Sequence, residues 1–195
     1  MLAIEPKTIT IKSGNILDFL FLSNIMFDKG VTVLLEACSI LKIQGVDFKC
    51  HFVGDWMDIS EKEFNSIIQK KGLQKNIFYY GPKYGVEKKH FFEMADIFIL
   101  PSLRETFLIV NIEAMQYSLP VISTYEGGIP DVVIDKKTGF LCKRNDAVCL
   151  ADKIGILINN PALRKQMGTA GRKRYEENFT LDHFEKKLAD ILNKI

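Results

Sequence analysis

Short apolar runs alternate with amphipathic stretches along this chain, in the pattern of an α/β protein. The first apolar run, residues 17–23, is almost uninterrupted, as expected of a strand covered on both faces. After Gly30, apolar residues return every three or four positions as far as Leu41, which predicts a helix that ends at Gly45. The same two patterns then follow one another toward the C-terminus.

This alternation predicts the fold class: α/β, a Rossmann-like parallel sheet of about six strands with helices on both faces. Residues 1–15 are expected to form an extended lead-in with a short strand at 8–12. The predicted strands are residues 17–23, 48–54, 77–80, 97–101, 121–124 and 138–141. The predicted helices lie between Gly30 and Gly45 and at residues 60–71, 86–94, 107–117, 145–159, 161–177 and 180–195.

Candidate ligand-binding residues come at or just after the predicted strand ends. In sheets of this class, ligands bind beyond the carboxyl ends of the strands. The positions that meet this condition are Asn24, Lys29, Gly54, Tyr84, Glu105 and Gly127.

Glu105 and Glu113 have seven residues between them, and they bracket the start of a predicted helix between two predicted strands. Carboxylates accept paired hydrogen bonds from hydroxyl groups, whereas helix N-termini and glycine turns offer backbone N–H groups to phosphate. The Gly127-Gly128 turn follows the next strand. A ligand rich in hydroxyls and phosphates could use every one of these parts.

Plainer interpretations of these residues stay open. Glu113 could be an exposed helix carboxylate, although apolar neighbours argue that it is buried, where an unpaired carboxylate is costly. Glu105 could serve only to interact with the helix dipole. Gly127 and Gly128 could form an ordinary turn rather than a point of close approach to a ligand.

Composition and charge exclude several classes of function. A net charge of +2 on 195 residues does not indicate a nucleic-acid partner. The basic clusters at residues 70–71, 88–89, 136–137 and 172–174 are interpreted as solvated surface. The first residues do not have the pattern of a signal peptide, and no apolar run is long enough for direct insertion into a membrane.

The cysteines and acidic residues do not indicate a metal site. Cys38 and Cys50 lie among apolar neighbours and are expected in the core, and no cysteine spacing is that of a zinc site. Asp55 and Asp58 are separated by two residues, unlike an Asp-x-Asp motif, so we expect no metal. The thiols favour a reducing, cytoplasmic location, with peripheral association at the inner face of the membrane as an option.

Three blocks of sequence resemble the C-terminal, donor-binding domain of a GT-B glycosyltransferase of retaining family 4, the group 1 glycosyltransferases. The first block, residues 17–30, ends in Lys29-Gly30 before the first predicted helix. The second is Ile77-Phe-Tyr-Tyr-Gly-Pro82, and the third, residues 95–139, holds the glutamate pair. Together the blocks extend over most of residues 17–160.

The resemblance implies catalytic roles for Lys29 and Glu105. Lys29 would neutralise the diphosphate leaving group, and Glu105 would face the donor sugar. Glu113 would accept hydrogen bonds from the ribose hydroxyls. The substrate would be a nucleotide sugar, linked to UDP or GDP, and no separate cofactor is expected.

The resemblance also implies a set of binding residues that act largely through the backbone. The N–H groups of Thr106, Phe107 and Leu108 would bind the distal phosphate, and the segment from Tyr84 to Val86 would lie beside the nucleobase. The remaining binding positions are Asn24, Gly54, Gly127 and Gly128.

The chain departs from the family pattern at two places. Asn24 stands where the family usually has an arginine, so a bidentate cation for the diphosphate is absent unless another residue, such as Lys83, supplies it. Thr106 and Leu108 stand where glycines are common, which alters the expected shape of the sugar pocket.

The resemblance implies only half of an enzyme. Residues 1–16 would be a linker, residues 17–178 the nucleotide-sugar-binding domain, and residues 179–195 a helix, capped by Thr180, that crosses back to a missing N-terminal domain. That domain would bind a glycan or lipid-linked acceptor, so this chain alone would be an inactive half of a hexosyltransferase. The alternatives are a degenerate, non-catalytic nucleotide-binding or interaction module, and half of a GT-B-like epimerase or phosphorylase.

Overall fold

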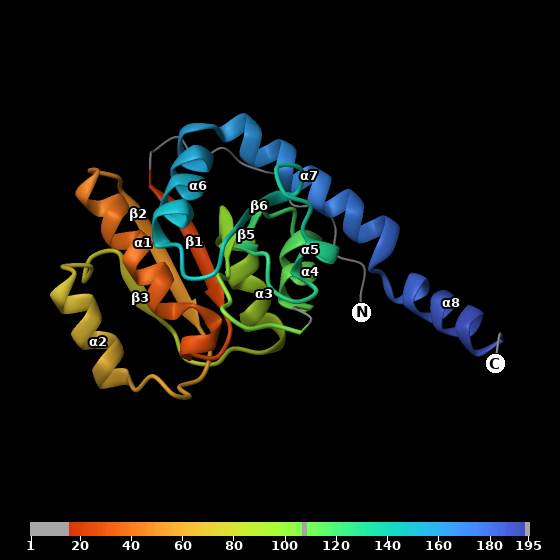
Figure 1. Cartoon of the computed structure of the whole chain (residues 1–195), viewed down its shortest axis with the longest axis horizontal. Helices are drawn as coiled ribbons and strands as arrows, with labels where there is room; N and C mark the ends of the chain where they lie inside the picture. The colour runs from red at the N-terminus through yellow and green to blue at the C-terminus, as the bar shows by residue number, and fades with distance from the viewer. Residues whose placement is uncertain (1–15, 107–108, 194–195) are drawn as a thin grey trace.

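The computed structural model describes residues 16–106 and 109–193, which form one sheet with helices around it (Figure 1). The predicted strand at 8–12 and the first residues of the predicted 107–117 helix lie outside this range. The strands are β1 (Leu17–Leu22), β2 (Phe48–Val53), β3 (Ile77–Tyr79), β4 (Ile97–Ile99), β5 (Val121–Thr124) and β6 (Gly139–Cys142). The helices are η1 (Phe27–Lys29), α1 (Val31–Ile43), α2 (Glu61–Lys70), α3 (Gly85–Met94), α4 (Ile109–Gln116), α5 (Ile129–Val132), α6 (Ala147–Asn159), α7 (Pro161–Asn178) and α8 (Leu181–Leu192).

All six strands are parallel and stand in the order β3-β2-β1-β4-β5-β6. Because parallel crossovers are right-handed, α1 and α2 cover one face of the sheet and α3 and α4 cover the other. α6 returns to the first face, where it packs on α1, while α7 packs on α4. This confirms the predicted Rossmann-like sheet with helices on both faces.

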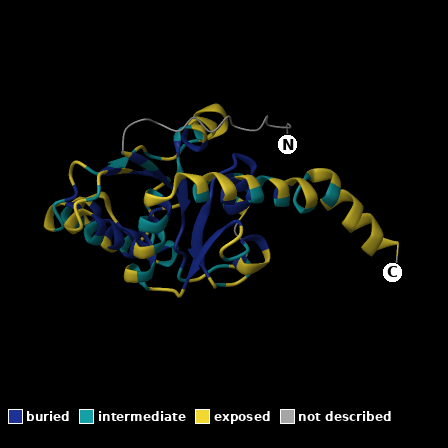
Figure 2. Ribbon diagram, turned by 90° about the horizontal axis from the view of Figure 1, so that it is seen from above, coloured by how far each residue is buried: buried dark blue, intermediate teal, exposed yellow. Residues whose placement is uncertain are grey.

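Aromatic side chains fill much of the core under the first helices. Phe19 stacks on Phe48 with ring centroids 5.2 Å apart, and Phe21 lies 4.9 Å from Phe52. The strands are buried nearly throughout (Figure 2). Such burial explains why they appear in the sequence as continuous apolar runs rather than alternating ones. Cys38 and Cys50 are core residues, as predicted.

Two short helices were not predicted from the sequence. The 3₁₀ turn η1 lies between β1 and α1, and α5 follows the Gly127-Gly128 turn. Each is a single turn, too short to produce a helical period in the sequence. Both lie at the carboxyl edge of the sheet, so they shape the loops that carry the candidate residues.

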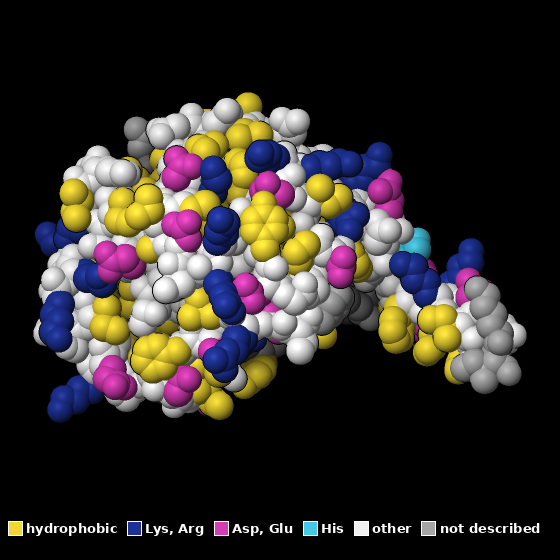
Figure 3. All heavy atoms as spheres, viewed as in Figure 1, with side chains coloured by type: hydrophobic (Ala, Val, Ile, Leu, Met, Phe, Trp, Pro, Cys, Tyr) yellow, Lys and Arg dark blue, Asp and Glu magenta, His cyan; other side chains and the backbone are white. Residues whose placement is uncertain are grey.

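The last helix, α8, points away from the rest of the domain (Figure 1). Thr180 caps it through a hydrogen bond from the backbone N–H of His183, as predicted. None of residues 181–192 is buried, and its apolar side chains gather along one side (Figure 3): Leu181, Phe184, Leu188, Ile191 and Leu192. Among the described residues, no helix combines the length and apolar character needed to cross a membrane.

Candidate functional site

The centre of the site is the gap between the loops that follow β1 and β4. Successive strands run from β1 outward to β3, and the chain then crosses back to β4 on the other side of β1. In doubly wound sheets this reversal opens a crevice at the carboxyl ends of the two strands. The two loops are joined directly, since the backbone N–H of Leu103 donates to the carbonyl of Asp28 at 2.8 Å.

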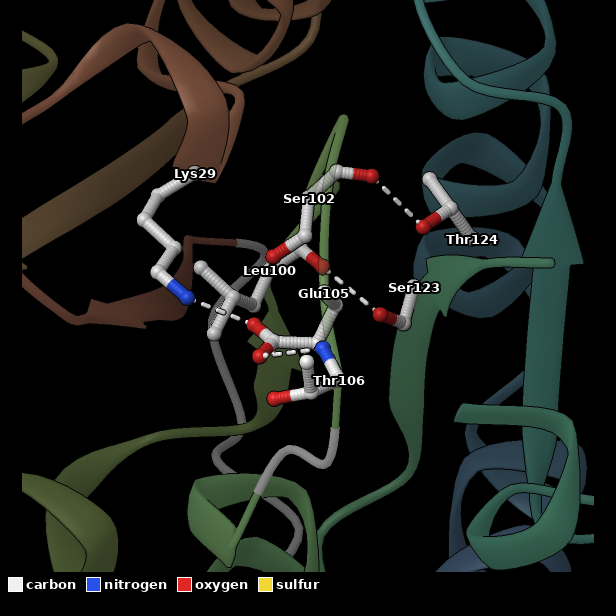
Figure 4. Close-up of polar contacts among 7 residues, drawn as sticks. All are labelled: Lys29, Leu100, Ser102, Glu105, Thr106, Ser123 and Thr124. Atoms are coloured by element: carbon white, nitrogen blue, oxygen red, sulfur yellow. Dashed lines mark hydrogen bonds and ion pairs between the residues drawn. The ribbon is translucent and has the colours of Figure 1, made fainter. Parts of the chain in front are cut away.

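Lys29 and Glu105 meet in this crevice (Figure 4). Lys29 Nζ lies 2.6 Å from Glu105 Oε2, and the side chains are only 23% and 8% exposed. The other carboxylate oxygen accepts the backbone N–H of Thr106 at 3.0 Å. A lysine on one loop and a carboxylate on the other, both partly removed from water, form a charged pair in front of the sheet, and their catalytic roles stay predictions.

Two glycines hold the backbones of these loops together. Gly30 has φ +75°, and a Cβ atom there would come within 2.0 Å of the carbonyl oxygen of Pro101. Gly127 has φ +52°, and a Cβ atom there would lie 2.0 Å from the carbonyl oxygen of Glu105. Only glycine combines this backbone conformation with this contact. The structure therefore gives Gly127 an intramolecular role, and its contact with a ligand stays a prediction.

Hydroxyl groups on β5 form hydrogen bonds with the backbone at the end of β4. Ser123 donates its Oγ hydrogen to the carbonyl of Leu100, and Thr124 donates to the carbonyl of Ser102, each at 2.7 Å (Figure 4). Gly128 N–H also donates to the carbonyl of Thr106 at 2.8 Å. The backbone that presents Glu105 is thus bound along its length to the next strand and the turn after it.

Glu113 on α4 forms an ion pair with a lysine from another helix. Both of its carboxylate oxygens accept hydrogen bonds from Lys88 Nζ on α3, at 2.6 and 2.7 Å. The two side chains are 27% and 23% exposed for Lys88 and Glu113. Glu113 is therefore partly buried, as its apolar neighbours suggested, but it is paired. The interpretation of the 88–89 cluster as plain solvated surface is wrong for Lys88, because α3 turns this side chain toward α4.

A pocket of about 150 Å³ lies beside these pairs, at the ends of β1, β2 and β3. Asn24, Gly54 and Tyr84 line it, together with Lys83 and Lys88. Below it, Tyr79 donates its hydroxyl hydrogen to the Gly54 carbonyl at 3.0 Å. Burial, with smaller effects of nearby Asp55 and Glu61, raises the pKa of Tyr79, so it remains a neutral donor at physiological pH.

Most of the residues predicted from the sequence lie at the carboxyl edge of the sheet, where they form two separate groups. Lys29, Glu105, Thr106, Gly127 and Gly128 surround the crevice between β1 and β4. Asn24, Gly54 and Tyr84 belong to the pocket, with Val86 exposed on the first turn of α3. Phe107 and Leu108 lie outside the described residues, so their predicted phosphate contacts stay predictions.

The sequence candidates did not include Lys88, and Lys83 was only a suggested substitute cation. Lys83 forms an i,i+4 pair with Glu87 at 3.1 Å. In the sequence, only its position near the start of the predicted 86–94 helix could have indicated Lys88. Lys89 is adjacent in the same helix and could not be distinguished from it. Within residues 16–106 and 109–193, no group of three or more histidine, cysteine, aspartate or glutamate side chains is arranged to hold a metal ion.

A doubly wound sheet with charged side chains at its switch point defines the class: an α/β domain that binds its ligand beyond the strand ends. Residues 7–174 match the family model for glycosyl transferases group 1, and this chain belongs to that family. The fold is that of the C-terminal domain of a GT-B glycosyltransferase.

Similar proteins support this assignment. A putative colanic acid biosynthesis glycosyltransferase, WcaL of Salmonella typhimurium, is 31% identical over 93% of this chain and 46% of its own length. The C-terminal domain of the group 1 glycosyltransferase LpcC from Francisella tularensis matches 85% of this chain and 87% of its own, with TM-score 0.76 and 24% identity. Anabaena HepE, solved with UDP and glucose, covers 93% of this chain and 49% of its own, with TM-score 0.83 and 21% identity. The chain thus spans about half the length of the full-length relatives it matches.

Proposed function

We propose that this chain is the sugar-nucleotide donor-binding half of a retaining glycosyltransferase that transfers a hexosyl group from a UDP- or GDP-sugar. The observation that carries the proposal is the Lys29–Glu105 pair, held at the switch point of the sheet with Glu113 on the helix that follows. HepE, which shares this fold, was solved with UDP and glucose, which supports a nucleotide sugar as the ligand.

Lys29 is proposed to act on the diphosphate. Its Nζ lies at the end of η1, where it pairs with the Glu105 carboxylate. A diphosphate carries more negative charge than one carboxylate, so it would compete for the ammonium group. Charge on the leaving diphosphate grows as the glycosidic bond breaks, and a fixed cation at that point stabilises the transition state more than the ground state.

Glu105 and Glu113 are proposed to bind the two sugars of the donor. Glu105, released from Lys29 by the diphosphate, would accept hydrogen bonds from hydroxyls of the transferred hexose. Glu113 would accept hydrogen bonds from the ribose. Glu105 lies on the loop after β4 and Glu113 lies on α4, so the two carboxylates would hold the two ends of the ligand.

The acceptor is proposed to come from a separate N-terminal half. The apolar side of α8, which is exposed among the described residues, supports this arrangement, because exposed apolar surface of that kind normally packs against another domain. The acceptor would be a glycan or a lipid-linked sugar. A closed cleft between the two halves would exclude water from the reacting atoms.

Calorimetric titration of the chain with UDP and with GDP tests this function. Binding of either is expected, with uridine and guanosine as controls that lack the diphosphate. If neither diphosphate binds, the chain is instead the degenerate module that the uncharged Asn24 would fit. If the complete protein epimerises the sugar or releases it to inorganic phosphate, and needs no sugar acceptor, the epimerase or phosphorylase alternative replaces transfer.

A further inference from the structure

Lys88 is the one described lysine that contacts both oxygens of a proposed ligand-binding carboxylate. The pair links α3 to α4, two helices separated by β4 in the chain. Hydrogen bonds from an ammonium group to both oxygens of a carboxylate fix the plane and the direction of that carboxylate. Lys88 therefore orients the Glu113 carboxylate.

The neighbouring residue shows that this arrangement is specific to position 88. Lys89 pairs with Glu93 at 3.4 Å within the same helix, and both side chains are about half exposed, 48% and 47%. Exposed pairs of this kind contribute little. Lys88 is more deeply buried, and its ammonium group also lies 5.9 Å from the centre of the Phe92 ring. The ring and the carboxylate together restrict where the ammonium group can point.

Lys88 also lines the pocket that contains Asn24 and Tyr84. It therefore connects the pocket to Glu113. Its ammonium group has three N–H donors, of which Glu113 takes two. A carboxylate has about four acceptor positions, so Glu113 keeps free positions for further donors.

We propose that Lys88 is a positioning residue for nucleotide binding: it aims the Glu113 carboxylate at the ribose and offers its remaining N–H to a ribose oxygen. The Lys88–Glu113 pair then presents one donor and several acceptors to a 2′,3′-diol. This inference rests on the proposed function, since it assumes that Glu113 binds ribose.

Lys88→Met tests the proposal because it removes the charge and the donors but keeps an unbranched side chain over Phe92. Lys88→Met is expected to weaken UDP or GDP binding about tenfold, and to weaken binding of the matching 2′-deoxy diphosphate much less. Lys89→Met is the matched control and should leave both affinities unchanged. A role in stability alone would not change the preference for ribose.

A double-mutant cycle makes the test sharper. If Lys88 acts through Glu113, the losses caused by Lys88→Met and Glu113→Gln should not add in the double variant. Additive losses, or an unchanged ribose preference in a Lys88→Met protein that melts like the wild type, would overturn the proposal. Failure of the wild-type chain to bind either nucleotide would instead count against the proposed function itself.

A second, independent observation concerns the thiols at the end of β6. Cys142 Sγ and Cys149 Sγ, the latter on the first turn of α6, lie 2.7 Å apart. Cys149 is partly exposed, whereas Cys38 and Cys50 are both completely buried. The N–H of Tyr125, two residues before Gly127, donates to the Cys142 carbonyl at 3.2 Å. The thiol pair therefore adjoins the turn that supports Glu105.

We infer that Cys142 and Cys149 form a dithiol modification site for a peroxide. The Cys149 sulfur would attack one oxygen of hydrogen peroxide, which breaks the O–O bond and gives a sulfenic acid; the thiol proton leaves with the other oxygen as water. The Cys142 thiol would then attack the sulfenic sulfur, form the disulfide and release a second molecule of water. Two thiols and one hydrogen peroxide thus give one disulfide and two waters.

Mass spectrometry of the folded chain after hydrogen peroxide treatment tests this site. The expected result is loss of two hydrogen atoms and a crosslink between Cys142 and Cys149. Cys149→Ser should abolish the crosslink and Cys38→Ser should not, because the Cys38–Cys50 pair is shielded from solvent. No crosslink in the wild type, or one that forms equally fast between Cys38 and Cys50, would overturn the inference.

Discussion

The Lys29–Glu105 and Lys88–Glu113 pairs have the same shortest distance, 2.6 Å, but are built differently. The first joins two loops whose backbones touch at Gly30 and Pro101, and the Gly127 turn after β5 packs against the Glu105 backbone. The second joins two helices through long side chains. The loop pair therefore depends on the close packing of the chain around it, whereas the helix pair depends on which face each helix presents.

The difference in construction suits the two pairs to different roles. A group that must stabilise a developing charge needs a fixed place, and a backbone held on two sides provides it. A group that selects a ligand needs direction but tolerates small adjustments, which a lysine side chain allows. We therefore expect changes at the loop pair to affect turnover and stability, and changes at the helix pair to affect affinity.

The largest expected effect concerns sugar transfer by the chain on its own, for which we propose a separate acceptor half. The isolated chain should not transfer sugar from UDP- or GDP-glucose to any acceptor, because alignment of donor and acceptor alone can lower the barrier by roughly 7–11 kcal/mol. Radiolabelled sugar transfer measures this. If this chain alone transferred sugar at ordinary enzyme rates, neither charged pair would need a second domain for catalysis.

Next in size is the loss of the loop cation. In the complete enzyme, Lys29→Ala should lower kcat by roughly 10²- to 10³-fold and change substrate affinity less, since the diphosphate charge develops in the transition state. Lys88→Met should show the reverse balance. Steady-state kinetics of both variants test this difference. If Lys29→Ala raises only KM, Lys29 does not stabilise the leaving diphosphate.

The backbone contact of the loop pair can be broken directly. Gly127→Ala should lower the free energy of unfolding by roughly 2–4 kcal/mol, measured in urea, because a Cβ atom meets the Glu105 carbonyl oxygen at a positive φ. Gly85 has the same φ, +52°, and a Cβ atom there would meet no other atom within 4 Å, so Gly85→Ala is the matched control. Equal losses would mean that the contact with Glu105 adds no constraint.

A smaller effect is expected at the helix pair. Glu113→Gln should weaken nucleoside diphosphate binding by on the order of 1–3 kcal/mol, the cost of a lost charge-assisted hydrogen bond. The reason is that the amide side chain would keep one acceptor oxygen but lose the charge that Lys88 orients. Calorimetry with the ribonucleotide and its 2′-deoxy analogue checks the role. If wild-type protein binds both equally well, Glu113 does not bind ribose.

The smallest effect should be that of chelation. Lys29 and backbone N–H groups, rather than a divalent ion, are expected to meet the phosphates, so EDTA should leave the affinity for UDP or GDP unchanged. Titrations with and without EDTA test this. A large loss that magnesium or manganese restores would falsify the metal-independent interpretation and diminish the role of the loop pair.

Much of this protein could be predicted from its sequence, because burial imposes a period on the chain. Strands covered on both faces must be apolar throughout, so β1 to β6 appeared as apolar runs at nearly their observed positions. The positions of Lys29 and Glu105 just after two of these strands then placed them at one edge of the sheet. That edge is where ligands bind in parallel sheets.

The partners of these residues were decided only by the tertiary structure. Lys88 and Lys89 are adjacent and chemically identical, but successive helix residues point in directions about 100° apart, so the packing of α3 beside α4 decides which one reaches Glu113. For Gly127 the sequence offered an ordinary turn or a contact with a ligand but not its packing contact, because the carbonyl it must avoid belongs to Glu105, on the far side of α4 and β5 in the chain. Periodicity reports which side of an element is buried, whereas contacts between distant residues depend on how those elements pack.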